Sequence, residues 1–301
     1  MKKFVFCIKR SRLPFIFLHT DVYRRIPSSM DWHLIIPSAP ELKEADLGKA
    51  REVRFRPGQP VTALLPQGLW KGTHILTPDE ILAAARALSG QELAARSEEM
   101  SRGFLPLPGG HRLGICGEKG RQGFRSIHSL CVRIAHEKKG AGAEIFESIR
   151  GKSALIIGPP GTGKTTLLRD LIRLYSENGF QVGVADERGE IAACRDGRPQ
   201  LDVGPCTDVV TGGEKAEAIL LLLRSMAPRV IAADELGGVE DARAILEALY
   251  GGVIALATVH GKSMGQVQKR RGMERLFQEG AFECALHLEG VGMPIRMEEW
   301  K

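Results

Sequence analysis

One stretch of the chain has the composition and spacing of a phosphate-binding loop. Residues 158–165 read Gly-Pro-Pro-Gly-Thr-Gly-Lys-Thr and satisfy GxxxxGK[ST] at every fixed position. In this pattern backbone N–H groups surround a phosphate, the lysine reaches the β- and γ-phosphates, and the last hydroxyl binds Mg²⁺. We therefore predict that ATP and Mg²⁺ bind here, through Gly158, Pro159, Pro160, Gly161, Thr162, Gly163, Lys164, Thr165 and Thr166.

An acidic pair farther along the chain has the groups that hydrolysis of a bound nucleotide needs. The apolar run Val230–Ala233 is followed at once by Asp234 and Glu235. We expect Asp234 to hold Mg²⁺ through water at the carboxyl end of a buried strand, and Glu235 to polarise the attacking water. The pair is typical of P-loop ATPases that hydrolyse; the alternative is a surface acidic pair without a catalytic role.

Two more apolar runs end in residues of catalytic types. Residues 182–185 precede Asp186-Glu187-Arg188, and residues 254–259 precede His260. In a parallel sheet these strand ends lie at the same edge as the phosphate-binding loop. Glu187 is then a candidate for assisting water activation, and His260 or Thr258 for sensing the γ-phosphate. A histidine taken alone is more often a core or surface residue, so the prediction for His260 depends on this shared edge.

The elements that must position these residues alternate between strand and helix. Residues 138–142 (Lys-Lys-Gly-Ala-Gly) are the best linker candidate. After the linker the pattern predicts strands at 153–157, 181–185, 229–233 and 253–259, and helices at 165–177, 214–226 and 239–250. Strands that are apolar on both faces and separated by helices indicate an α/β fold with a largely parallel sheet.

The preceding part of the chain has a mixed pattern, which indicates a smaller α+β domain. Two short strands are expected at 50–56 and 61–65. Thr77 is placed to cap a helix, with Glu80 completing a capping box. The remaining expectations are a helix at 91–102, a tight turn at 108–110 between strand-like arms and a strand at 129–135.

Length and composition agree with a folded chain of one large or two modest domains. The 301 residues are 43% hydrophobic and 26% charged, which excludes a disordered chain, a collagen-like repeat and a coiled coil. Aromatic residues make up 6%, which does not favour a stacking platform for single-stranded nucleic acid. We divide the chain into a basic extension (1–29), an α+β domain (30–137) and a P-loop domain (138–301).

The net charge of +6 lies in the basic extension. Residues 1–29 hold seven basic side chains and one acidic one, and the rest of the chain is balanced. We interpret these residues as an upstream extension from a wrongly chosen start, because Met30 opens a more regular sequence. Contact of this arm with nucleic acid or an anionic membrane surface is the alternative. The folded body itself is not expected to bind nucleic acid.

Cysteine spacing and hydropathy indicate a cytoplasmic protein. The six cysteines form no CxxC pair and no metal-ligand spacing, so we expect reduced, mostly buried thiols. The N-terminal apolar stretch is interrupted by basic residues and has no signal-peptide pattern. No uninterrupted run approaches the roughly 20 apolar residues that a membrane span requires.

Several further motifs resemble those of the stage III sporulation protein AA family. The resemblance covers about residue 45 to the C-terminus, in the same order, and is more specific than the P-loop alone. It rests on residues 108–117 (PGGHRLGICG), 129–135 (SLCVRIA), 186–192 (DERGEIA), 202–204 (DVG), 207–209 (TDV) and 224–228 (RSMAP).

That family is similar to the ATPases of type II and type IV secretion and of pilus systems. The resemblance implies a RecA-like core in a hexameric ring motor, on the cytoplasmic face of the channel complex between mother cell and forespore. It implies that Lys164 and Thr165 bind nucleotide and Mg²⁺ and that Glu235 is the catalytic carboxylate. Asp186-Glu187 matches the acidic box and His260 the histidine box. Secretion ATPases commonly have Gly-Glu where this chain has Asp234-Glu235, so metal coordination is expected to follow the ordinary P-loop pattern.

Arginines are the last group of candidates, because ring ATPases often neutralise transition-state charge with an arginine from a neighbouring subunit or the N-terminal domain. Arg112, Arg133 and Arg188 lie in the family-like motifs. Most arginines form only surface ion pairs, which is the alternative for each. For the whole protein, the alternatives to a motor are an ATPase stimulated by nucleic acid and a scaffold that binds nucleotide without hydrolysing it.

Overall fold

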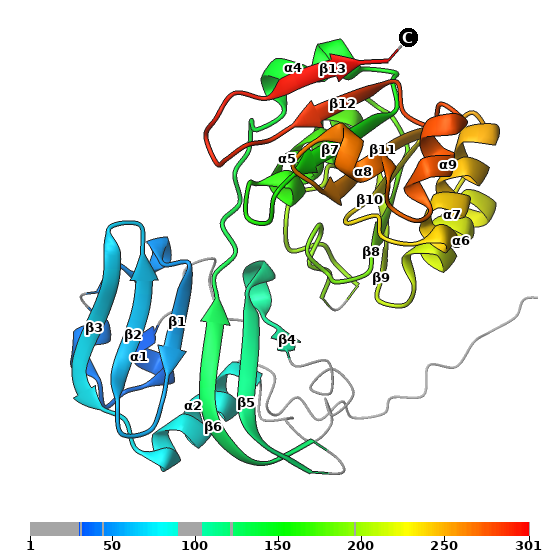
Figure 1. The fold of residues 1–301 in the computed structure, drawn as a ribbon. Coiled ribbons are helices and arrows are strands. Elements are labelled where there is room, and N and C mark those ends of the chain that lie inside the picture. The colour runs from blue at the N-terminus through cyan, green and yellow to red at the C-terminus, as the bar shows by residue number, and fades with distance from the viewer. Residues whose placement is uncertain are drawn as a thin grey trace, which may run out of the picture.

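The structure, a computed structural model, describes residues 30, 32–43, 45–89, 104–120, 123–195 and 197–300. Two β-sheets, each with helices and a core of its own, form two bodies joined by the segment that follows β6 (Figure 1). The basic extension 1–29 and the expected helix 91–102 lie outside the described residues.

The first sheet is antiparallel, in the order β3-β2-β1-β6-β5-β4. Its strands are β1 Glu52–Phe55, β2 Pro60–Leu65, β3 Gly68–Ile75, β4 Phe104–Pro106, β5 Arg112–Gly120 and β6 Gly123–Arg133. The α-helices and 3₁₀ turns beside it are α1 Trp32–Ile35, η2 Pro40–Leu42, η3 Leu47–Lys49, α2 Pro78–Ser89 and η4 Pro108–Gly110. Helix α2 starts with the expected capping box: Glu80 accepts the N–H of Thr77 at 2.7 Å and donates its own N–H to the Thr77 hydroxyl at 3.3 Å.

The second sheet has the order β13-β12-β7-β11-β10-β8-β9, parallel except for β13. Its strands are β7 Ala154–Gly158, β8 Val182–Asp186, β9 Thr207–Thr211, β10 Val230–Ala233, β11 Ile254–His260, β12 Cys284–His287 and β13 Arg296–Glu299. Its helices are α4 Ala143–Ile149, α5 Lys164–Glu177, α6 Lys215–Ser225, α7 Val239–Tyr250, α8 Met264–Gln268 and α9 Met273–Gln278. The strands and helices predicted for 153–259 lie within one residue of these bounds.

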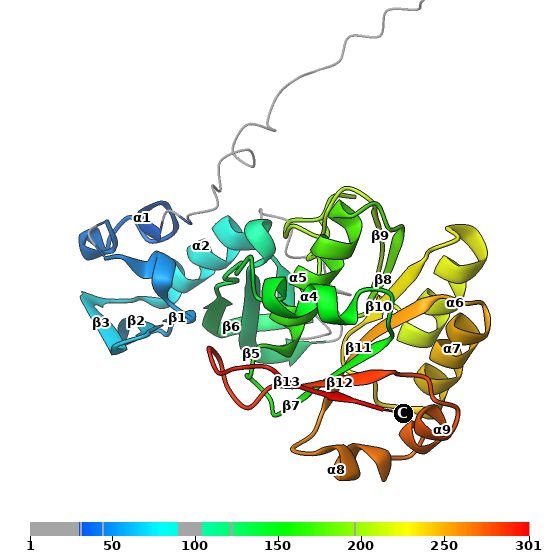
Figure 2. The same ribbon diagram turned by 90° about the horizontal axis from the view of Figure 1, so that it is seen from above.

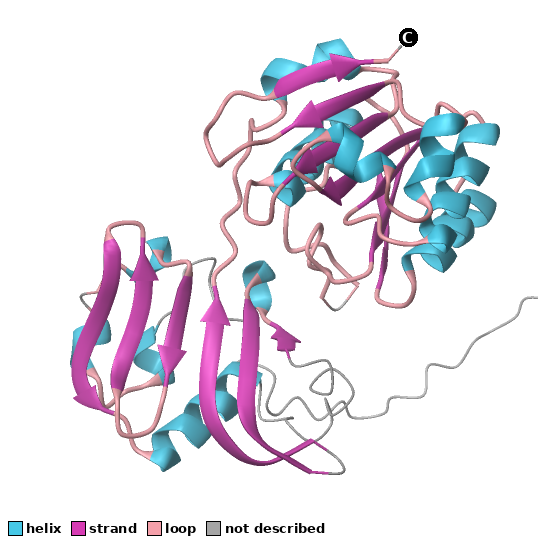
Figure 3. Ribbon diagram, in the orientation of Figure 1, coloured by secondary structure: helices cyan, strands magenta, loops and turns pink. Residues whose placement is uncertain are grey.

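Helices cover both faces of the second sheet, so its central strands are buried throughout (Figures 2 and 3). Helices α6, α7 and α9 pack with one set of strand side chains, and α4 and α5 pack with the other. In β10, Val230 and Ala232 enter the core beside α5, while Ile231 and Ala233 enter the core beside α6 and α7. In β7, β8 and β10 polar side chains therefore come only where the strands end.

Several features differ from the sequence expectations. The strand expected at 129–135 spans Gly123–Arg133, and helices α1, α4, α8 and α9 and strands β3, β9, β12 and β13 were not predicted. The cysteines are free, but of the five described only Cys284 is buried, so the expectation of mostly buried thiols was wrong. A thiol is small and only weakly polar, and it is tolerated at partly exposed positions.

Candidate active site

The phosphate-binding loop joins β7 to α5, and its backbone conformation requires glycine at two positions. Gly161 and Gly163 have φ of 78° and 94°, a left-handed region that side chains with a Cβ rarely adopt. Thr162 donates its hydroxyl to the carbonyl of Pro159 at 2.9 Å, which closes the loop. The loop leads directly into the N-terminus of α5, whose N–H groups and dipole favour an anion.

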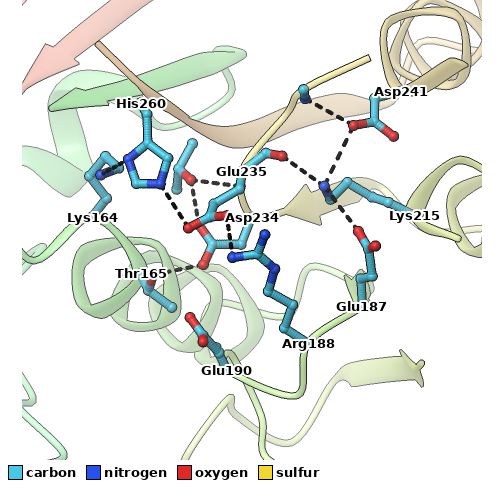
Figure 4. Close-up of polar contacts among 12 residues, drawn as sticks. Lys164, Thr165, Glu187, Arg188, Glu190, Lys215, Asp234, Glu235, Asp241 and His260 are labelled. Atoms are coloured by element: carbon cyan, nitrogen blue, oxygen red, sulfur yellow. Dashed lines mark hydrogen bonds and ion pairs between the residues drawn. The ribbon is translucent and has the colours of Figure 1, made fainter. Parts of the chain in front are cut away.

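Lys164 is buried within this loop. Its ammonium donates to the carbonyl oxygen of Pro159 at 2.9 Å and lies 3.0 Å from Nδ1 of His260 (Figure 4). Burial lowers the pKa of Lys164, while the charges of Asp234 and Glu235 act in the opposite direction. The ammonium is thus held close to the place where the loop geometry would put a phosphate.

Asp234 follows β10 and faces the first turn of α5. The Thr165 hydroxyl donates to Oδ2 of Asp234 at 2.6 Å, and the Thr258 hydroxyl donates to Oδ1. Thr258 is fully buried and also accepts the N–H of Glu235 at 2.8 Å. Thr258 therefore supports the acidic pair, and its suggested role in sensing a γ-phosphate stays a prediction.

The oxygen atoms of Thr165 and Asp234 fit a magnesium ion. Mg²⁺ prefers hard oxygen ligands and is commonly held by one or two side chains together with phosphates and water. Across the residues that the structure describes, no group of three or more His, Cys, Asp or Glu side chains is arranged to hold a metal ion. The remaining ligands would therefore come from the nucleotide and from water.

Glu235 has an unusual backbone conformation for a residue with a side chain. Its φ is 53°, a left-handed value that costs about 1–3 kcal/mol unless surrounding groups hold it. Its Oε1 lies 2.8 Å from Nε2 of His260, and its Oε2 lies 2.6 Å from Nη1 of Arg188. The structure therefore brings two other predicted residues, His260 and Arg188, into contact with Glu235, and His260 links the carboxylate to Lys164.

The two acidic residues at the end of β8 are arranged differently from one another. Asp186 is buried and accepts the backbone N–H groups of Glu190, Ile191 and Ala192, which fixes the loop after the strand. Glu187 extends to the ammonium of Lys215 at 3.3 Å, on the side of Glu235 away from the phosphate-binding loop (Figure 4). The role of Glu187 in water activation stays a prediction, and its contact is with Lys215.

Arg112, at the start of β5, connects the first body to this loop. Its guanidinium donates to the carboxylate of Glu190 and to the carbonyl oxygen of Arg188. A cavity of about 210 Å³ lies at this junction and is lined by residues of both bodies, including Arg112, Glu187 and Arg188. Arg133 is exposed on β6 and pairs in register with Glu52, within the first sheet.

Lys215 is a site residue that the sequence analysis missed. It is the first residue of α6, and it donates to the carbonyl oxygen of Glu235 at 2.8 Å. A signal was present in the sequence, because a basic residue at the first position of a helix opposes the helix dipole. Acidic or carbonyl partners, such as those that Lys215 has, offset this cost.

The strand order, the phosphate-binding loop and the acidic strand end define a RecA-like P-loop ATPase core. The fold is similar to the Legionella pneumophila ATPase DotB, with a TM-score of 0.58 and 19% identity over 84% of this chain and 75% of that one. It is also similar to the pilus retraction motor PilT with bound ADP, with a TM-score of 0.59 and 16% identity over 87% of this chain and 80% of that one. At these identities the similarity shows the fold.

The chain belongs to the family of sporulation stage III protein AA. The family's sequence profile matches residues 39–299. Stage III sporulation protein AA of Bacillus subtilis (strain 168) is 37% identical over 267 residues, which cover 84% of this chain and 87% of the relative. The resemblance inferred from the motifs is therefore confirmed.

Proposed function

We propose that the protein binds ATP with Mg²⁺ and hydrolyses it to ADP and phosphate. One observation carries the proposal: Lys164, Thr165, Asp234 and Glu235 meet at the carboxyl edge of the parallel sheet. These are the residue types that a P-loop ATPase uses for phosphate, metal and water. The secretion-ATPase fold and the family membership support the same conclusion.

In this proposal each side chain has a defined task. ATP–Mg²⁺, when bound, supplies the electrophilic γ-phosphorus and the cation that neutralises its oxygens. Lys164 exchanges the carbonyl of Pro159 for phosphate oxygens, and Thr165 and Asp234 hold the cation. Glu235 orients the attacking water and accepts its proton, which requires the Arg188 guanidinium to leave the carboxylate. Arg188, with an exposed side chain, then neutralises charge on the transferred phosphate, and His260 links Glu235 to Lys164.

We further propose that the protein works as a hexameric ring in the cytoplasm of the mother cell. It would bind the cytoplasmic face of a membrane channel complex of sporulation and power its assembly or operation. Family membership and the secretion-ATPase fold support this assignment. Within the described part of the chain, no helix is both long and apolar enough to cross a membrane. In this proposal the protein reaches the membrane through a partner protein.

The test combines Mg²⁺-dependent phosphate release with solution mass. We expect Lys164→Ala and Glu235→Gln each to lower turnover roughly 100-fold or more, with Glu235→Gln still binding ATP. By light scattering, Glu235→Gln with ATP–Mg²⁺ should shift from a monomer to about six subunits. The proposal of hydrolysis would be contradicted if the wild type bound nucleotide but released phosphate no faster than Lys164→Ala.

A nucleotide-gated scaffold is the second candidate, and one observation favours it. Lys164 and Glu235 both have protein partners, the Pro159 carbonyl for the ammonium and Arg188 for the carboxylate. A protein that only switches between this arrangement and a nucleotide-bound one would bind ATP tightly and release no phosphate. The phosphate-release assay separates the two candidates.

A further inference from the structure

Lys215 is a buried cation at the edge of the active site. Its side chain is only 7% exposed, and Nζ lies 2.8 Å from the carbonyl oxygen of Glu235, 3.3 Å from Oε2 of Glu187 and 3.5 Å from Oδ2 of Asp241. Figure 4 shows Lys215 on the opposite side of Glu235 from Lys164 and the phosphate-binding loop. Lys215 is therefore not placed to bind a phosphate held by that loop.

The position is unfavourable for a lysine unless it has a specific task. Burial removes the ammonium from water, and the first turn of a helix carries partial positive charge. Three oxygen-bearing partners from three elements offset these costs: Glu187 after β8, Glu235 after β10 and Asp241 in α7. Lys215 thus joins the ends of two parallel strands to helices α6 and α7.

The bond that Lys215 makes falls on the backbone carbonyl of Glu235 itself, a residue with a strained backbone. Glu235 is left-handed, with φ of 53°. Its N–H is fixed by the Thr258 hydroxyl at 2.8 Å, and its carbonyl by Lys215 at 2.8 Å. Two residues on, the N–H of Gly237 is fixed by Asp241 at 3.0 Å. A left-handed residue with a side chain persists only when such contacts hold it.

We propose that Lys215 is a positioning residue that holds the backbone of Glu235 in the conformation from which its carboxylate activates water. Glu187 and Asp241 act in turn as the counter-charges that hold Lys215. The inference rests on the proposed function, in which Glu235 is the catalytic carboxylate. It assigns to Glu187 a role through Lys215 rather than contact with the water.

The expected signature is a loss of turnover without a loss of nucleotide affinity. Among the described residues, the hydrogen bond and ion pairs of Lys215 reach Glu235, Glu187 and Asp241, none of which belongs to the phosphate-binding loop, so ATP binding should not depend on it. Displacement of a catalytic group by about 1 Å can cost on the order of 100-fold in rate. We expect Lys215→Met to lower kcat roughly 30-fold, with KM for ATP and Kd for ADP unchanged within about twofold.

The experiment measures kcat, KM and ADP affinity for the full chain and three variants. Lys215→Arg keeps a buried cationic donor and should recover most of the loss, since a guanidinium can still donate to the carbonyl. Lys269→Met removes an exposed lysine just after α8 and should behave like the wild type. If Lys215→Met does not fold, Asp241→Asn carries the test, with an expected loss in kcat of about threefold.

The outcomes distinguish the inference from the function on which it rests. Absence of turnover in the wild type overturns both. Turnover in the wild type with unchanged kcat in Lys215→Met, or in Asp241→Asn where that variant is used, overturns the role of Lys215 alone. A parallel loss of ADP binding and kcat in Lys215→Met also overturns it, because that pattern belongs to a general structural residue. A loss confined to kcat, with recovery in Lys215→Arg, supports the proposal.

Discussion

The two sheets of this protein differ in which of their side chains are in contact with water. In the antiparallel sheet, β3 alternates between exposed and half-buried residues, so one face stays in contact with water along the whole strand. In the parallel sheet, β7, β8 and β10 are buried at every position. In these three strands polar chemistry is therefore restricted to the strand ends, which lie at one edge of the sheet.

The two bodies meet at this edge through the loop that follows β8. Arg112 of the first body holds the loop at Glu190 and at the Arg188 carbonyl, and Arg188 in turn reaches Glu235. Lys139 and Glu137 add contacts to Asp202, at 2.5 Å to its carboxylate and 2.7 Å to its N–H. The first body thus holds a loop of the active site while contributing no strand to the second sheet.

Among the substitutions that test the contact between the two bodies, Arg112→Ala is expected to have the largest effect. Loss of the guanidinium releases the loop that carries Arg188, so kcat for ATP hydrolysis should fall by a factor of about 10, with both bodies still folded. Steady-state ATPase assays and circular dichroism check this.

Arg125→Ala is the matched control, because Arg125 belongs to the same sheet and is exposed, 3.5 Å from Glu118. Equal activity of the two variants would mean that the first body does not influence the active site through Arg112.

A smaller effect, confined to the first body, is expected from Glu80→Gln. Burial tends to raise the pKa of Glu80, but hydrogen bonds from Ser38, Thr77 and His74 outweigh it and lower the pKa to about 2 from an ordinary 4.5. A depressed pKa stabilises the folded state above pH 4.5, and this contribution is lost as pH falls from 4.5 towards 2. At pH 7 the variant should lose about 1 kcal/mol of stability, because hydrogen bonds to a carboxylate are stronger than those to an uncharged amide.

Thermal unfolding at pH 7, 4 and 3 measures this difference between wild type and Glu80→Gln. The difference in Tm between the two proteins should narrow as the pH falls, and ATPase activity at pH 7 should not change. A gap that stays constant with pH would refute the role of the Glu80 carboxylate. Glu118→Gln, which alters an exposed ion pair in the same body, is the control.

The smallest effect on stability is expected from Lys164→Met, in the second body. Burial lowers the pKa of Lys164, so the charged lysine costs stability in the absence of nucleotide. The variant should raise Tm by roughly 1–3 °C near pH 7 in phosphate-free buffer. As pH rises through the lowered pKa the wild-type lysine loses its charge, so the difference should shrink.

Scanning calorimetry of Lys164→Met against Lys138→Met, which alters an exposed lysine of the connecting segment, provides the comparison. A lower Tm in Lys164→Met would mean that the contacts to Pro159 and His260 outweigh the cost of burial.

The sequence predicted the second body better than the first, and the reason is physical. Strands buried on both faces appear as continuous apolar runs, such as Val230–Ala233, and the helices between them begin and end at clear boundaries. Strand β3 escaped prediction because its half-buried residues give no continuous pattern. Strand β12 is only four residues long, and its burial depends on pairing with β7 and β13.

The candidate site shows the same division between local and tertiary features. The sequence by itself determined the local features: glycines in a left-handed loop, a lysine and a hydroxyl beside a helix N-terminus, and an acidic pair after a buried strand. Tertiary structure alone decided which groups meet: β7 lies beside β11 rather than β8, which places His260 between Lys164 and Glu235. Lys215 reaches the Glu235 carbonyl, and Arg112 reaches Glu190, for the same reason. Contacts between residues distant in sequence depend on strand order and on the docking of the two bodies, neither of which a local pattern encodes.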